Sequence, residues 1–106
     1  MALEVNGGNI EDVLNEKSVT VLDFWAPWCG PCRMMKPKFE KVASENTTEV
    51  QLYTMDIENN KDYVMSLGVK SIPTLKVFNQ GGLVETKVGV LQEQQIKGIV
   101  DGLILN

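Results

Sequence analysis

Residues 24–37 read Phe-Trp-Ala-Pro-Trp-Cys-Gly-Pro-Cys-Arg-Met-Met-Lys-Pro and contain both cysteines of the chain, Cys29 and Cys32. The apolar run from Val19 to Trp25 leads into this segment, and a helical pattern leads out of it. A Cys-X-X-Cys pair at the point where a strand gives way to a helix is a signature of dithiol chemistry. This segment therefore indicates both the fold and the site.

The two cysteines are expected to differ in their chemistry. Cys29 precedes the predicted helix, whereas Cys32 lies one turn inside it. Helix N-termini carry unpaired N–H groups and a partial positive charge, which favour a thiolate and lower the pKa of a thiol. We therefore expect Cys29 to be the thiolate and Cys32 to lie within disulfide reach. The competing interpretation is two buried, inert thiols; Trp28 before the pair and Gly30-Pro31 within it argue against that.

Length and composition limit the class of protein. A chain of 106 residues, 43% of them hydrophobic, is typical of one domain whose core needs no metal or disulfide staple, so a single domain over residues 1–106 is expected. With 10 basic and 14 acidic residues, the net charge of −4 argues against nucleic acid as the main partner. The chain has no histidine, so no metal site is expected, short of sharing between two chains or carboxylate ligands.

The N-terminus carries no visible targeting signal. Residues 1–6, Met-Ala-Leu-Glu-Val-Asn, lack the basic region and apolar run of a secretory signal. No stretch approaches the roughly 18 apolar residues that a membrane-spanning helix needs. Two cysteines in a chain without an export signal fit a reducing compartment. These features predict a cytoplasmic protein with no membrane partner.

Apolar periodicity predicts the order β-α-β-α-β-α-β-β-α. Strands are expected at 2–5, 19–24, 50–57, 74–78 and 83–88, the last two alternating and joined by a hairpin at 79–82. Helices are expected at 9–16, from the cysteines to about 46 with a kink at Pro37, around 63–67 before a cap at Gly68, and over 96–103. Strands that alternate with helices imply a parallel core, and the hairpin adds an antiparallel edge.

The string Trp28-Cys29-Gly30-Pro31-Cys32 resembles the active site of the thioredoxin family. Further matches lie along most of the chain in the family's order and spacing: Asp23, Trp25, Pro37, Ile72-Pro73-Thr74 and Lys87-Val88-Gly89. The resemblance implies the thioredoxin fold, an α/β architecture with a central mixed sheet of about five strands and about four flanking helices.

The resemblance also implies an activity. Cys29 would attack a disulfide of another protein to form a mixed disulfide, and Cys32 would then release the reduced substrate. A flavin-containing thioredoxin reductase drawing on NADPH would recharge the protein, which would bind no cofactor, act in electron transport and cell redox homeostasis, and be a monomer. Two alternatives stay open: a disulfide oxidant with the same fold, and a binding module that serves as a subunit of a larger enzyme.

Around Cys29 we expect an apolar docking surface, with packing in loops and core as the alternative, most of all for Val88 and Val90. Trp25 is expected to pack beneath the site, and Arg33 either adds positive charge near the thiolate or is a solvated helix residue. The resemblance implies a cis peptide bond before Pro73. The residues of the expected docking surface are Trp28, Gly30, Pro31, Ile72, Pro73, Val88, Gly89 and Val90.

Asp23 is the anomaly of an otherwise apolar strand. Strands buried on both faces rarely hold an unpaired carboxylate, so its pKa should lie above the ordinary value. The resemblance implies that Asp23 exchanges a proton with Cys32. The family usually has a lysine nearby on the following strand, where this chain has Thr54. The tuning of Asp23 is therefore expected to differ from that of the family.

Overall fold

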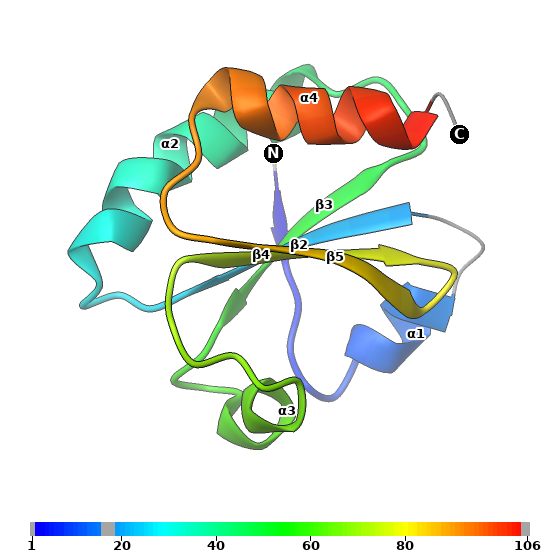
Figure 1. The fold of residues 1–106 in the computed structure, drawn as a ribbon. Coiled ribbons are helices and arrows are strands. Elements are labelled where there is room, and N and C mark those ends of the chain that lie inside the picture. Colours follow the sequence, from blue (N-terminus) through cyan, green and yellow to red (C-terminus); the bar gives the residue numbers. More distant parts are fainter. Residues whose placement is uncertain (1, 16–18, 105–106) are drawn as a thin grey trace.

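Five strands form one mixed sheet with helices on both faces (Figure 1). The structure, a computed structural model, describes residues 2–15 and 19–104. The strands are β1 (Leu3–Glu4), β2 (Val19–Trp25), β3 (Gln51–Asp56), β4 (Thr74–Asn79) and β5 (Gly82–Val88). The helices are α1 (Ile10–Asn15), α2 (Gly30–Glu45), α3 (Lys61–Ser66) and α4 (Glu93–Ile104). The predicted element order is confirmed; Glu16, the expected end of the first helix, lies outside the described residues.

The sheet has the order β1-β3-β2-β4-β5, so β2 is its central strand. β2 runs parallel to β3 and antiparallel to β4. This register places Asp23 beside Thr54 of β3 on one side and beside Leu75 of β4 on the other. The strand that leads into the cysteines is therefore held by a neighbour along each edge.

Helices α2 and α4 cover one face of the sheet, and α1 and α3 cover the other (Figure 1). Side chains alternate between the faces of a strand, so β2 contributes to two cores. The core on the α2 and α4 face includes Val21, Met35, Phe39, Leu75, Ile96 and Val100. The core on the opposite face includes Ile10, Leu14, Leu22, Phe24, Val64 and Phe78.

Local sequence explains where α2 begins and where α3 ends. Pro31 lies in the first turn of α2, where a missing N–H costs nothing. Pro37 lies inside α2, as expected, and removes one hydrogen bond of the helix. Gly68 follows α3 with a φ of +70°, and its N–H donates to Met65 O at 3.0 Å while the next N–H reaches Val64 O. This pair of bonds is a Schellman motif and confirms the predicted glycine cap.

The expected alternation of β4 is wrong. Residues 74–78 are all buried, because β4 lies inside the sheet between β2 and β5 with helices over both faces. Lys76, which reads as a solvent-facing residue in the sequence, is only 6% exposed. Its Nζ donates a hydrogen bond to Thr86 Oγ1 of β5 at 3.1 Å, which satisfies part of the buried charge. β5 is an edge strand, and its side chains are mostly exposed.

Candidate active site

Cys29 and Cys32 form a disulfide at the start of α2, with their Cα atoms 5.2 Å apart. Cys29 is the N-cap residue, with extended backbone, and its Sγ accepts the N–H of Cys32 at 3.2 Å. The Cys29 carbonyl oxygen accepts the N–H of Arg33, the first turn of the helix. Both sulfur-bearing residues are almost fully buried, at 5% and 4% exposure. The sulfur of Cys29 thus sits where unpaired helix N–H groups converge.

Two segments far along the chain lie against the cysteines. Cys29 Sγ is 3.8 Å from the carbonyl oxygen of Ile72. The Ile72–Pro73 peptide bond is cis, as the resemblance implied. Gly89 has a φ of +101° and donates its N–H to Pro73 O at 2.9 Å. The predicted proline loop and glycine segment therefore adjoin one another beside the disulfide.

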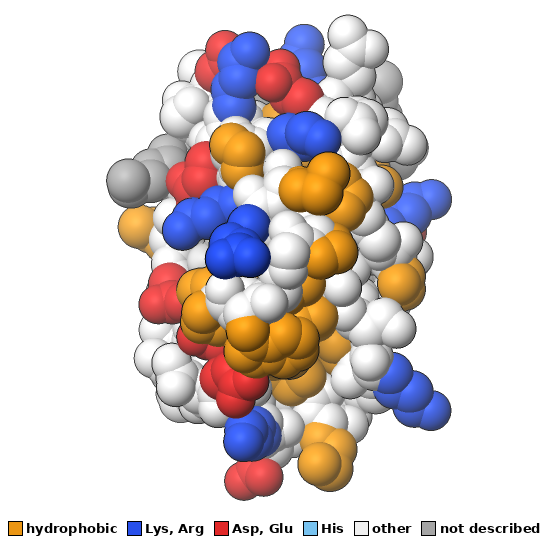
Figure 2. Space-filling view, turned by 90° about the vertical axis from the view of Figure 1, so that its left-hand side faces the viewer, with side chains coloured by type: hydrophobic (Ala, Val, Ile, Leu, Met, Phe, Trp, Pro, Cys, Tyr) orange, Lys and Arg blue, Asp and Glu red, His pale blue; other side chains and the backbone are white. Residues whose placement is uncertain are grey.

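The expected docking residues are only partly on the surface. Trp28, Pro31 and Val88 are exposed, Gly30, Ile72 and Gly89 are half-buried, and Pro73 is buried. Val90 packs against the core under α2 and α4. The structure thus places Val90 with the packing alternative raised from the sequence. Figure 2 views this end of the molecule and shows a band of hydrophobic side chains with charged groups at its margins.

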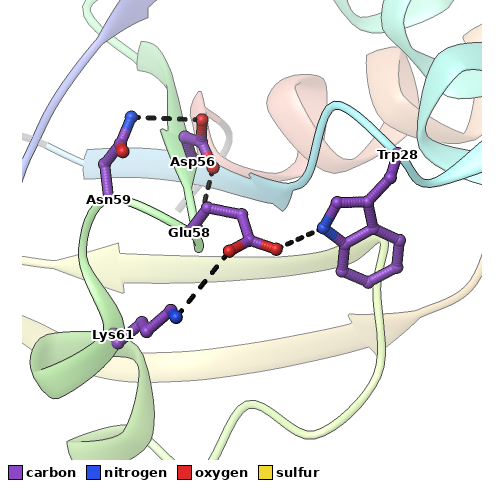
Figure 3. Close-up of polar contacts among 5 residues, drawn as sticks. All are labelled: Trp28, Asp56, Glu58, Asn59 and Lys61. Atoms are coloured by element: carbon purple, nitrogen blue, oxygen red, sulfur yellow. Dashed lines mark hydrogen bonds and ion pairs between the residues drawn. The ribbon is translucent and has the colours of Figure 1, made fainter.

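Trp28 is anchored by a contact that sequence reasoning missed. Its Nε1 donates a hydrogen bond to Glu58 Oε1, and Glu58 Oε2 lies 3.9 Å from Lys61 Nζ (Figure 3). Asp56 stabilises the turn that carries Glu58. Its Oδ1 accepts a hydrogen bond from the N–H of Glu58 at 2.8 Å, and its Oδ2 accepts one from Asn59 Nδ2 at 3.3 Å. The sequence could have predicted this proximity, because the parallel strands β2 and β3 end at the same edge of the sheet and the residues that follow them should meet there.

Asp23 is buried at 4% exposure in the middle of β2. Burial raises the pKa of its carboxyl group from the ordinary value of 3.8 to about 7, and the negative charge of Glu40 adds to the effect. Its Oδ1 has no hydrogen-bond partner among the described residues. Thr54, its neighbour on β3, brings no charge to it. The direction of this shift agrees with the sequence expectation.

A cavity of about 490 Å³ opens beside Asp23 and Cys32. We call it the Asp23 cavity. It is bounded by the N-terminal strand, by β2 and β3, and by the first turns of α2. Trp25 and Thr54 form part of its wall, and Trp25 also packs against the two cysteines, as expected. The sequence did not reveal this space, since it depends on how α2 crosses the sheet.

Within residues 2–15 and 19–104, no cluster of three or more acidic or cysteine side chains is arranged to hold a metal ion. In the same part of the chain, no helix has the length and apolar character required to span a bilayer.

The fold and the site together define a class of protein, an α/β protein that carries a reversible dithiol–disulfide pair at a helix N-terminus. A protein-family model described as Thioredoxin matches residues 2–102. Thioredoxin from Haemophilus influenzae is 36% identical over 100 residues, which cover 93% of this chain and 94% of that protein. Thioredoxin from Pseudomonas aeruginosa is 36% identical over 94 residues, covering 89% and 87%.

A solved structure of a mutant thioredoxin from Halobacterium salinarum superimposes with a TM-score of 0.86 at 33% identity and covers 95% of this chain and 88% of that one. The chain belongs to the thioredoxin family. Its activity is therefore that of a protein-disulfide oxidoreductase, with Cys29 and Cys32 as the pair that undergoes dithiol–disulfide exchange.

Proposed function

We propose that this oxidoreductase works in the direction of reduction and transfers two electrons from its dithiol to disulfides in other proteins. The observation that carries the proposal is the N-cap position of Cys29, whose Sγ accepts the Cys32 N–H at 3.2 Å. The same N–H would stabilise a Cys29 thiolate in the reduced protein. Cys32, within the first turn, has no comparable position, so Cys29 is the attacking sulfur.

The proposed reaction has two steps. The Cys29 thiolate attacks one sulfur of the substrate disulfide, and the other substrate sulfur leaves as a thiolate. Cys32 gives its proton to Asp23 and attacks Cys29 Sγ, which closes the Cys29–Cys32 disulfide and expels the second substrate thiolate. The substrate gains two electrons, and the active-site pair loses them. Asp23 is suited to this role because burial raises its pKa to about 7, near physiological pH.

Substrate docking is assigned to the surface around Cys29. The Ile72 carbonyl, 3.8 Å from Cys29 Sγ, and the exposed side chains of Trp28 and Val88 lie at its centre. Small residues such as Gly30 and Gly89 let a substrate backbone approach closely. Pro31 completes this surface, whereas the buried Pro73 and the packed Val90 support it from beneath.

The electron donor, the cellular location and the oligomeric state are also part of this proposed function. Electrons come from NADPH through a flavin-containing thioredoxin reductase, and the protein itself binds no cofactor beyond its redox-active disulfide. It works as a cytoplasmic monomer, a single domain over residues 1–106, in electron transport and cell redox homeostasis. Support comes from the thioredoxin relatives, which match 89–93% of this chain.

An insulin-reduction assay with a thioredoxin reductase and NADPH tests the proposal, with the Cys29→Ser protein as the inactive control. NADPH oxidation that depends on both insulin and Cys29 is the expected result. The equilibrium reduction potential separates a reductase from an oxidant, because thioredoxins have a potential of about −270 mV and a strong disulfide oxidant one of about −120 mV. A potential near the second value would refute the proposed direction.

A further inference from the structure

Two residues that line the Asp23 cavity each carry a buried polar atom with no hydrogen-bond partner among the described residues, namely Asp23 Oδ1 and Trp25 Nε1. Both belong to β2 and are two residues apart, so their side chains stand on the same face of the sheet roughly 6.6 Å apart along the strand. Buried polar groups without partners are uncommon and costly. This wall of the cavity is therefore suited to receive a polar group.

One face of α2 lines the cavity opposite that wall. Cys32, Lys36 and Glu40 follow one another at intervals of four residues, which places them on one side of the helix. Glu40 is already engaged, because its Oε2 accepts the backbone N–H of Ala2 at 3.1 Å. Lys36 is exposed, and its Nζ lies 5.7 Å from the centre of the Trp25 ring. Its ammonium group thus lies over Trp25, two residues along β2 from Asp23.

The charges that surround Asp23 come from two elements. β1 contributes Glu4, and α2 contributes Arg33, Lys36 and Glu40, while β3 contributes only the neutral Thr54. Glu40 opposes ionisation of Asp23. Lys36 is the cation of this set that lies over the β2 wall itself, and lysine has a flexible four-carbon stem that allows its head to move several ångströms.

We propose that Lys36 is a positioning residue for the dithiol reaction, whose ammonium moves from the Trp25 ring into the Asp23 cavity and pairs with the Asp23 carboxylate. The inference rests on the proposed role of Asp23 as proton acceptor. Pairing keeps Asp23 ionised before Cys32 attacks. When the Cys32 proton reaches Asp23, the carboxyl group becomes neutral and Lys36 returns to the ring. In this way the chain supplies from α2 a cation that its β3 neighbour, Thr54, does not.

The test is a titration of the Asp23 carboxyl group by carbon NMR in the reduced protein. Lys36→Met should raise the pKa of Asp23 by about one pH unit, because an opposite charge within 4–6 Å stabilises the carboxylate. Lys38→Met, with the same loss of charge in the same helix, is the matched control and should leave the pKa as in the wild type. Lys36→Arg keeps the charge and should restore most of the wild-type value.

Kinetics give a second readout. At a pH equal to the wild-type pKa of Asp23, a one-unit rise lowers the ionised fraction about fivefold, so Lys36→Met should slow release of the mixed disulfide by about that factor. Equal pKa values in Lys36→Met and Lys38→Met would overturn the inference, as would a Lys36→Arg protein that behaves like Lys36→Met. An Asp23→Asn protein that releases the mixed disulfide at the wild-type rate would instead overturn the proposed role of Asp23, and the NMR titration distinguishes the two failures.

Discussion

Asp23→Asn should make the protein more stable at alkaline pH, because it removes a carboxyl group that is costly to ionise where it lies. The pKa of Asp23 is raised from 3.8 to about 7, chiefly by burial and then by the charge of Glu40. A difference of about three pH units corresponds to about 4 kcal/mol of destabilisation once the group is ionised, at 1.36 kcal/mol per unit. Asparagine keeps the shape of the side chain and cannot ionise.

The direction follows from proton counting. Between pH 3.8 and about 7 the folded protein holds a proton on Asp23 that the unfolded chain has lost. The free energy of unfolding therefore falls as pH rises through that window and levels off above it. At pH 4 wild type and Asp23→Asn should be similar in stability, whereas at pH 8 the variant should be more stable by up to about 4 kcal/mol.

Urea unfolding of the oxidised proteins at pH 4, 6 and 8 measures this difference. Asp101→Asn, an exposed acidic residue on α4, is the matched control and should change stability by less than about 0.5 kcal/mol at each pH. The decisive result is the slope of the free energy of unfolding against pH. If wild type and Asp23→Asn lose stability equally between pH 4 and pH 8, the Asp23 carboxyl group is solvated in the oxidised protein, and the argument from burial fails.

Three further outcomes are expected. In the reduced protein Cys29 should react with iodoacetamide faster than Cys32 at pH 7, and Cys32→Ser should trap substrates as mixed disulfides while Cys29→Ser traps none; faster reaction at Cys32 would reverse the assignment. Phe39→Ala removes a fully buried ring and should lower the free energy of unfolding by about 3–5 kcal/mol in urea melts; a loss below about 1 kcal/mol would contradict its place in the core. Gly89→Ala and Gly98→Ala both add a methyl group with no atom within 4 Å, but only Gly89 has a positive φ, +101°. Gly89→Ala should therefore lower the free energy of unfolding by about 1–2 kcal/mol, whereas Gly98→Ala should raise it by up to about 1 kcal/mol. Equal effects of the two substitutions would contradict the backbone argument.

Prediction of the fold from the sequence succeeded where local pattern and environment agree. Val19 to Trp25 is apolar except for Thr20 and Asp23 and is the central strand, and Gly68 caps the end of its helix as predicted. It failed at β4, because Thr74 and Lys76 are polar and suggest a solvent face. Their burial depends on β5 lying alongside and on helices covering both faces, which no local pattern contains.

The residues of the candidate site also fall into those that the sequence predicts and those that only the structure shows. Cys29, Cys32 and Asp23 were found because each breaks or defines a local pattern. The contact between Trp28 and Glu58 joins residues 30 positions apart, and the Asp23 cavity depends on the angle at which α2 crosses the sheet. In the sequence, Glu58 and Lys36 resemble ordinary solvated charged residues. Only the structure shows that they lie beside Trp28 and Trp25, where they can act on the site.

The central position of β2 has a consequence for hydrogen exchange. Amides of a strand that is paired along both edges exchange through opening of the whole protein, whereas edge strands such as β1 and β5 open locally. The strand that holds Asp23 and leads to Cys29 should therefore be among the slowest to exchange. When the disulfide is reduced, protection of β2 should change only as much as global stability does, so deuterium uptake along β2 would measure directly how much the Cys29–Cys32 bond stabilises the protein.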